Sequence, residues 1–233
     1  MSDENDIQLG IEVSAEDKTI KAGIKGDQDA INKFFSGIIP DFIKDGTGIL
    51  SDQVKFWRWS KQVDIIKKAQ VKIESSGLSK KQIPLKVLIP IIQNSSLEED
   101  PAIQDKWANM LANAATGNVE VSPNYTAILN ELSPLEVSIL DQIYFAVNKE
   151  TNYEKRKALQ FDASKLKSII SASDEKMDLI VENLYRLNLL QSPAGQGVML
   201  GNFPFALRTT KVFEFTTLGY EFVRACSWRP KLN

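Results

Sequence analysis

Ser173–Leu187, with the sequence SDEKMDLIVENLYRL, decides the fold of this chain. Ser173 is a typical helix N-cap residue, and the apolar residues that follow it recur at helical spacing. These apolar residues are Met177, Ile180, Val181, Leu184 and Leu187. The stretch therefore predicts an amphipathic helix, and the segments on either side of it predict what kind of domain it belongs to.

Two helices are expected before this stretch, and two strands and a helix after it. Ser133-Pro134-Leu135-Glu136 combines an N-cap serine, a proline at the first position and a glutamate at the third, which predicts a helix reaching about Val147. The remaining elements are expected at Ala163–Ser171 (capped by Asp162), Leu189–Gln191, Val212–Phe215 and Thr217–Cys226. Three helices, a β-hairpin and a closing helix form the winged-helix pattern. The charged stretch Lys149–Lys157 is predicted to be a solvated connector, and Ser192–Gly201 the tip of the hairpin.

The fold class expected for the whole chain is mainly α, with an N-terminal helical domain and a C-terminal winged-helix (α+β) domain. Residues 1–26 are predicted to be a disordered acidic tail, 27–122 the helical domain and 123–233 the winged-helix-like domain. In the helical domain we expect a helix from Asp27 or Asp29 to about Ile39 and a long one from about Ile49 to Glu74. A short buried helix should begin near Pro84, and another should open at a Ser96–Glu99 capping box and end at Gly117.

The composition argues against several kinds of chemistry. The chain has 233 residues, 28 basic and 30 acidic, no histidine and a single cysteine. Without histidine it lacks the usual general base and the commonest zinc ligand, and one cysteine cannot form an internal disulfide. We therefore expect no catalytic residues, no cofactor and no bound metal. Cys226 is interpreted as a small buried residue, and a cytoplasmic location without a transmembrane segment is expected.

The helix at Ser173–Leu187 has an unusual charge for its place in the pattern. A winged helix usually binds DNA through its third helix, which then faces phosphates and is normally basic. Here the polar positions hold Asp174, Glu175, Asp178 and Glu182 against only Lys176 and Arg186. These four carboxylates are the candidate interaction residues: they would offer negative charge to a basic protein surface, or simply face solvent.

A second candidate surface lies in the basic segment Lys55–Lys86, which has nine basic residues against two acidic ones. It suits a nucleic-acid groove, a membrane-surface helix or the solvated face of a helical bundle. The candidate contact residues are Lys55, Trp57, Arg58, Trp59, Lys61, Lys68 and Lys72. Arg208 and Lys211, near the wing, are a further possible phosphate contact.

Four acidic residues gather at a predicted helix start: Glu98, Glu99, Asp100 and Asp105. They suit a divalent-metal site or an acid/base pair, but acidic residues also favour a helix N-terminus because of its partial positive charge. We prefer the second interpretation, since no other carboxylate motif would complete a site.

Several motifs are spread along the chain: Ile83–Leu88 (IPLKVL), Ser96–Asp100 (SLEED), Lys106–Ala114 (KWANMLANA), Leu132–Glu136 (LSPLE) and Leu218–Cys226 (LGYEFVRAC). Together they resemble the Abi-alpha (abortive-infection alpha) family, over roughly residues 45 to 226. The resemblance implies bacterial defence against phage by abortive infection, and it brings no catalytic motif. The leading hypothesis is a non-enzymatic defence protein that binds a protein partner. The alternatives are a winged-helix DNA-binding regulator and a membrane-surface effector that uses the segment 30–60.

Overall fold

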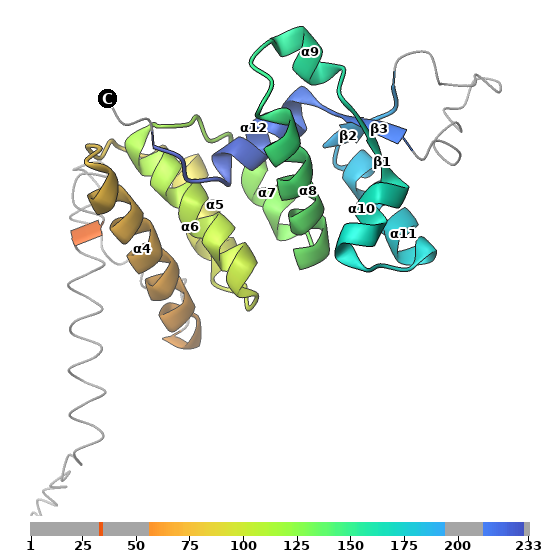
Figure 1. Cartoon of the computed structure of the whole chain (residues 1–233). Helices are drawn as coiled ribbons and strands as arrows, with labels where there is room; N and C mark the ends of the chain where they lie inside the picture. Colours follow the sequence, from red (N-terminus) through yellow and green to blue (C-terminus); the bar gives the residue numbers. More distant parts are fainter. Residues whose placement is uncertain (1–32, 35–55, 194–211, 231–233) are drawn as a thin grey trace, which may run out of the picture.

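The computed structural model describes residues 33–34, 56–193 and 212–230, and it is mainly helical (Figure 1). Several predictions lie outside the described residues. They are the acidic tail, most of the helix ending near Ile39, the start of the long helix, the hairpin tip and the candidate residues Lys55, Arg208 and Lys211. The helices are α4 (Phe56–Ser76), α5 (Leu85–Ser95), α6 (Pro101–Thr116), α7 (Asn124–Asn130), α8 (Pro134–Val147), α9 (Tyr153–Lys157), α10 (Ala163–Ile170), α11 (Asp174–Arg186) and α12 (Thr217–Ala225).

The elements are arranged as a row (Figure 1). At one end α4 and α5 pack against α6, in the middle α12 packs against both α6 and α8, and at the other end α10 and α11 lie beside a small sheet. α4 (Phe56–Ser76) is buried along one side, through Val63, Ile66, Ala69 and Ile73. α12 comes after α11, β2 and β3 in the sequence, but it lies in the middle of the row (Figure 1). There it connects the helices of the first part to those of the second through its contacts with α6 and α8.

The sheet has three antiparallel strands in the order β1-β3-β2: β1 (Gln160–Asp162), β3 (Val212–Phe215) and β2 (Leu190–Gln191). The predicted pairing of the last two strands is confirmed, with Leu190 opposite Phe215. β1 was not predicted. It pairs with β3 through Phe161 and Phe213, whose rings stack 6.2 Å apart, and it leads directly into the Asp162 cap of α10.

The predicted start of α6 is wrong. The sequence suggested a capping box at Ser96 and Glu99, but the helix begins at Pro101 and its N-cap is Asp100. Asp100 Oδ1 accepts hydrogen bonds from the backbone amides of Ala102 and Ile103, at 2.9 and 3.1 Å. Ser96 belongs to the end of α5 instead. The proline explains the shift, because its fixed φ suits the first helical position and disfavours helical geometry in the residue before it.

The connector Lys149–Lys157 is mostly exposed, as predicted, but it contains a short helix that was not predicted. This helix, α9, is capped by Asn152, whose side-chain oxygen accepts a hydrogen bond from the amide of Lys155 at 3.0 Å. α9 is important for the site described below, because it positions Arg156.

The predicted starts of α8, α10, α11 and α12 are confirmed. Ser133 and Glu136 form both halves of a capping box at α8, and the side chains of Asp162 and Ser173 cap α10 and α11. α12 is capped by Thr216 and comes very close to the sheet at Gly219. A β-carbon added at Gly219 would lie 2.4 Å from the carbonyl oxygen of Leu189, so only glycine allows this approach.

Candidate functional site

The outer face of α11 presents a stripe of carboxylates around one apolar side chain. Glu175, Asp178 and Glu182 are exposed, and between them lies Leu179, which is 62 % exposed. The opposite face of the helix is buried through Met177, Ile180 and Leu184. We call Glu175, Asp178, Leu179 and Glu182 the acidic stripe.

Both ends of α11 are fixed to neighbouring elements. Asp174 pairs with Lys167 of α10 at 2.6 Å, and Arg186 pairs with Glu131, which follows α7. The three carboxylates of the acidic stripe, in contrast, form no ion pair with any residue that the structure describes. Of the four predicted interaction residues, Asp174 therefore serves the fold, while Glu175, Asp178 and Glu182 remain available to a partner.

Of the seven candidate contact residues in the basic segment, the structure describes the side chains of Lys68 and Lys72 only. Lys68 pairs with Asp105 of α6 at 2.9 Å, and Lys72 is half-buried. The candidates Trp57, Arg58, Trp59 and Lys61 belong to the first turns of α4, and the structure does not describe their side chains. The packing of α4 on α6 therefore gives Lys68 an ion-pair partner within the protein, Asp105.

The acidic residues near the start of α6 have separate roles. Asp100 caps α6, Glu98 Oε1 accepts a hydrogen bond from the amide of Asp100 at 2.8 Å, and Asp105 pairs with Lys68. Within the described ranges, no three acidic or cysteine side chains gather closely enough to hold a metal ion.

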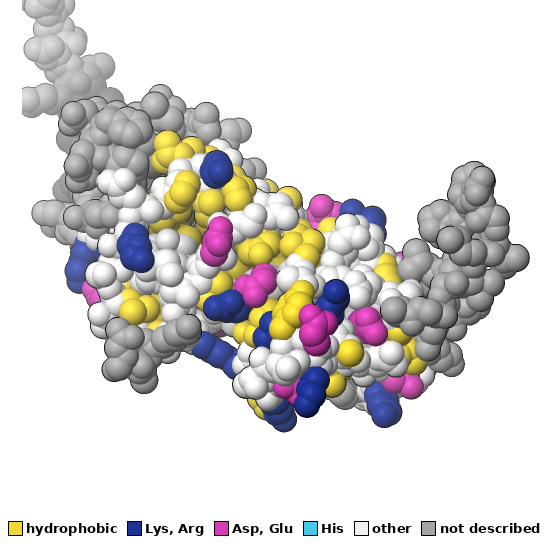
Figure 2. All heavy atoms as spheres, turned by 90° about the horizontal axis from the view of Figure 1, so that it is seen from above, with side chains coloured by type: hydrophobic (Ala, Val, Ile, Leu, Met, Phe, Trp, Pro, Cys, Tyr) yellow, Lys and Arg dark blue, Asp and Glu magenta, His cyan; other side chains and the backbone are white. Residues whose placement is uncertain are grey.

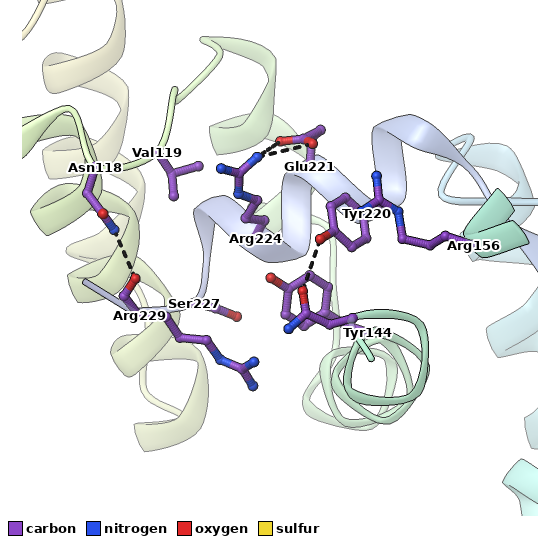
Figure 3. Close-up of a pocket in the computed structure, with 10 residues that line it drawn as sticks. Asn118, Val119, Tyr144, Arg156, Tyr220, Glu221, Arg224, Ser227 and Arg229 are labelled. Atoms are coloured by element: carbon purple, nitrogen blue, oxygen red, sulfur yellow. Dashed lines mark hydrogen bonds and ion pairs between the residues drawn. The ribbon is translucent and has the colours of Figure 1, made fainter. Parts of the chain in front are cut away.

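A pocket that sequence reasoning missed lies between α8, α9 and α12 (Figure 3). Its volume is about 380 Å³, and its lining residues come from separate segments of the chain. α9 contributes Arg156, α8 contributes Tyr144, and α12 contributes Tyr220 and Arg224. The remaining lining residues are Asn118 and Val119 after α6, Asn148 after α8, Glu221 on α12, and Ser227 and Arg229 at the C-terminal end.

Two arginines of this pocket rest against its two tyrosine rings. The guanidinium of Arg156 is 4.0 Å from the ring centroid of Tyr220, and that of Arg229 is 5.6 Å from the ring of Tyr144. The two rings are themselves 5.2 Å apart, and the Tyr220 hydroxyl donates to Asn148 Oδ1 at 3.0 Å. Burial raises the pKa of Tyr144 to about 12.

The remaining arginine is already paired. Arg224 Nη1 lies 3.1 Å from Glu221 Oε2, one turn earlier on α12 (Figure 3). Among the described residues, Arg156 and Arg229 have no such carboxylate partner. The pocket therefore has an excess of positive charge, although the chain as a whole is slightly acidic.

Three asparagines hold the C-terminal segment that forms one wall of the pocket. Asn109 and Asn113 lie on α6 and donate to the carbonyls of Cys226, Ala225 and Ser227 at 2.8–2.9 Å. Asn118 donates to Asn113 Oδ1 and to the carbonyl of Arg229. Asn109 and Asn113 belong to the KWANMLANA motif, so this motif attaches α6 to the end of α12.

The pocket gave no recognisable signal in the sequence, because its lining residues are separated by up to about a hundred positions. Only the fold brings them together. On the face of the molecule shown in Figure 2, basic and acidic side chains are interspersed around apolar ones, so no large area of one charge marks a binding surface. In the described parts of the chain, no helix is long and apolar enough to span a membrane.

A protein-family model matches most of this chain. The model of the family described as abortive infection alpha matches residues 58–226, which is more than half of the chain. No curated protein and no solved structure matches this chain. The matched range includes the asparagines of α6, the acidic stripe and α12.

Proposed function

This chain belongs to the abortive infection alpha family, and from that premise we propose that it is a phage-defence protein that acts by binding a protein partner, without catalysing a reaction. The acidic stripe carries this proposal. Three carboxylates that form no ion pair with any described residue surround an exposed leucine on a helix whose other face is buried.

The position of α11 supports a winged-helix interpretation of residues 123–233. α8, α10 and α11 are followed by the antiparallel strands β2 and β3, and α12 closes the module. In such a module α11 takes the place of the helix that usually enters a DNA groove. Its exposed carboxylates would meet phosphates there, and like charges repel. We propose that the same helix is used for a protein surface instead.

The chemistry of the stripe indicates what the partner should offer. An exposed leucine supplies an apolar anchor for a small pocket, and carboxylates around it pair with lysine or arginine at the rim. Charges at the rim raise the rate of association and select against acidic surfaces. The partner is therefore a protein with a basic surface around an apolar depression.

The two alternative functions stay predictions. A DNA-binding regulator would depend on the basic segment and the wing, and a membrane-surface effector on the segment 30–60. The one lysine of that set whose ion pair is described, Lys68, already has a partner in Asp105. No described contact favours either alternative over the acidic stripe.

The test is a comparison of phage protection and partner capture in bacterial cells. The first variant carries Glu175→Lys, Asp178→Lys and Glu182→Lys. A matched variant changes three exposed acids elsewhere, with Glu99→Lys, Glu120→Lys and Glu154→Lys. Both variants change the net charge equally, so general charge effects cancel. We expect the stripe variant to fold normally, to lose protection in a plaque assay and to lose the cross-linked partner, while the matched variant keeps both.

Two outcomes would contradict the proposal. One is protection by the stripe variant at the level of the wild type, with circular dichroism showing that both are folded. The other is turnover of a nucleotide or nucleic acid by the purified wild-type protein, because this would make the protein an enzyme.

A further inference from the structure

We propose that the pocket between α8, α9 and α12 binds a phosphate-bearing small molecule of nucleotide size. This goes beyond the proposed protein partner. The pocket shares no residue with the acidic stripe, so either site can be tested without the other.

The charge of the lining indicates an anion. Three arginines face a single carboxylate, that of Glu221, which is already paired with Arg224. Two guanidinium groups, those of Arg156 and Arg229, are left without a carboxylate among the described residues. They come from α9 and from the segment after α12. A ligand that contacts both should therefore carry at least two negative charges or one multivalent group.

The two available arginines are held in place before any ligand arrives. Each rests on a tyrosine ring, and the ring under Arg156 is itself fixed by the hydrogen bond from Tyr220 to Asn148. Asn118 binds the backbone carbonyl of Arg229 at 3.4 Å. Prior ordering lowers the entropy cost of binding, and the planar fork of arginine matches the oxygen pairs of phosphate. This favours phosphate over a diffuse negative charge.

The size and the neutral groups of the pocket favour a nucleotide over free phosphate. A volume of about 380 Å³ falls in the range of pockets that hold whole small molecules, whereas a single phosphate would leave most of it empty. The amide nitrogen of Asn148 and the hydroxyl of Ser227 have no partner among the described residues, and Val119 adds an apolar edge. These groups suit a sugar and a base. A more open hollow of about 470 Å³ shares Tyr144, Ser227 and Arg229, and its lining includes the ion pair between Lys106 and Asp141.

The experiment is isothermal titration of the full-length protein with defined probes. The probes are AMP, GMP, CMP, UMP and ATP, with adenosine, inorganic phosphate and citrate as comparisons. Adenosine has no phosphate, phosphate alone has no nucleoside, and citrate has the charge without phosphorus. We expect at least one nucleotide to bind at least about tenfold more tightly than all three comparisons.

Variants assign the binding to the pocket. Arg156→Gln and Arg229→Gln each remove one charged hydrogen-bonding partner, so each should weaken nucleotide binding by about tenfold or more. Lys155→Gln is the matched control, because it removes the same charge from the neighbouring exposed residue of α9 and should leave affinity unchanged. All variants are checked by thermal unfolding, and Arg156→Lys should restore part of the affinity.

The proposal is overturned if no nucleotide binds at millimolar concentration, or if phosphate or citrate binds as tightly as the best nucleotide. It is also overturned if Lys155→Gln weakens binding as much as Arg156→Gln, since the attraction would then be a general effect of charge.

Discussion

At the scale of single residues, the asparagines of α6 have the clearest structural role. Asn113 is fully buried, and its side-chain nitrogen donates to the carbonyls of Ala225 and Ser227 at 2.8 and 2.9 Å. The last carbonyls of a helix have no partner within the helix, so another element must supply one. Here α6 supplies the donors for the end of α12. The spacing of Asn109 and Asn113, four residues apart, places both on one side of α6.

Replacing Asn113 tests this role. Asn113→Ala leaves two carbonyls without their donor in a buried place, so we expect a loss of roughly 1–3 kcal/mol in the free energy of unfolding. Asn130→Ala, at an exposed position of α7, is the control and should change it by less than about 0.5 kcal/mol. Urea titration measures both. Equal effects of the two changes would show that the bonds to α12 contribute little.

Cys226 gives a prediction about pH. Burial raises the pKa of its thiol, so the native state disfavours the thiolate, whereas an unfolded cysteine ionises near pH 8.5. Because the folded pKa is the higher one, this contribution to stability is complete below about pH 8.5 and declines as the pH rises above it. The slope for one such group is at most about 1.4 kcal/mol per pH unit.

The measurement compares the wild type with Cys226→Ala by urea unfolding from pH 7 to pH 10. Other groups titrate similarly in both proteins, so the difference between the two curves isolates the thiol. We expect the stability advantage of the wild type to shrink above about pH 8.5. A constant difference over the whole range would mean that the thiol ionises as freely in the native state as in the unfolded one.

At the scale of elements, the capping box of α8 also positions α11. Glu136 Oε2 accepts hydrogen bonds from the amide and hydroxyl of Ser133, and its Oε1 accepts one from Asn183 of α11 at 2.6 Å. Glu136 is buried, so its carboxylate depends on these partners. One residue thus fixes the start of a helix and the placement of the helix that carries the acidic stripe.

We therefore expect Glu136→Ala to do more than weaken a helix cap. The loss in the free energy of unfolding should be roughly 1–3 kcal/mol, and backbone amides of α11 should exchange hydrogen faster even where α8 stays protected. Glu120→Ala, at an exposed position, is the control and should affect neither quantity. Unchanged exchange in α11 would show that the bond to Asn183 does not hold that helix.

Elements that are determined by neighbouring residues could be predicted from the sequence, whereas elements that depend on distant residues could not. The starts of α8, α10 and α11 were predictable because a cap is formed by residues within four positions of one another. The start of α6 was misplaced because Ser96 and Asp100 are both good caps, and Pro101 decides between them. β1 was missed because three residues have no periodicity of their own. They become a strand only beside β3, which lies about fifty residues further along the chain.

The candidate sites follow the same rule. The carboxylates of the acidic stripe were predictable, since helical spacing alone puts Glu175, Asp178 and Glu182 on one side of α11. The ion pair between Asp174 and Lys167 was not predictable, because it depends on how α10 and α11 pack against each other. The pocket between α8, α9 and α12 could not be predicted from the sequence. Arg156 and Arg229 become neighbours of the same tyrosine pair only after α12 returns to the middle of the molecule.

At the scale of the whole molecule, α12 connects the two parts that the sequence treats as separate domains, 27–122 and 123–233. It packs on α6 from the first part and on α8 from the second. Its end is held by the asparagines of α6, and its start lies against the sheet at Gly219. The buried apolar side chains of the described residues form one continuous cluster from Phe34 to Cys226. The domain boundary near residue 122 stays a prediction. The shared packing nevertheless indicates that the two parts unfold together.

Because the two parts share one core, we expect the full-length protein to unfold in a single cooperative transition. Hydrogen exchange in α6, which carries the buried Trp107, reports on the first part, and hydrogen exchange in α11 reports on the second. The two probes should give the same midpoint in urea, and the calorimetric and van't Hoff enthalpies should agree. A chain ending at Phe215 lacks α12 and should lose both parts together, since α6 and α8 would each expose the face that α12 covers. If instead α6 stayed protected from exchange in that shortened chain, or the two probes gave separate midpoints, the first part would be a domain that folds alone.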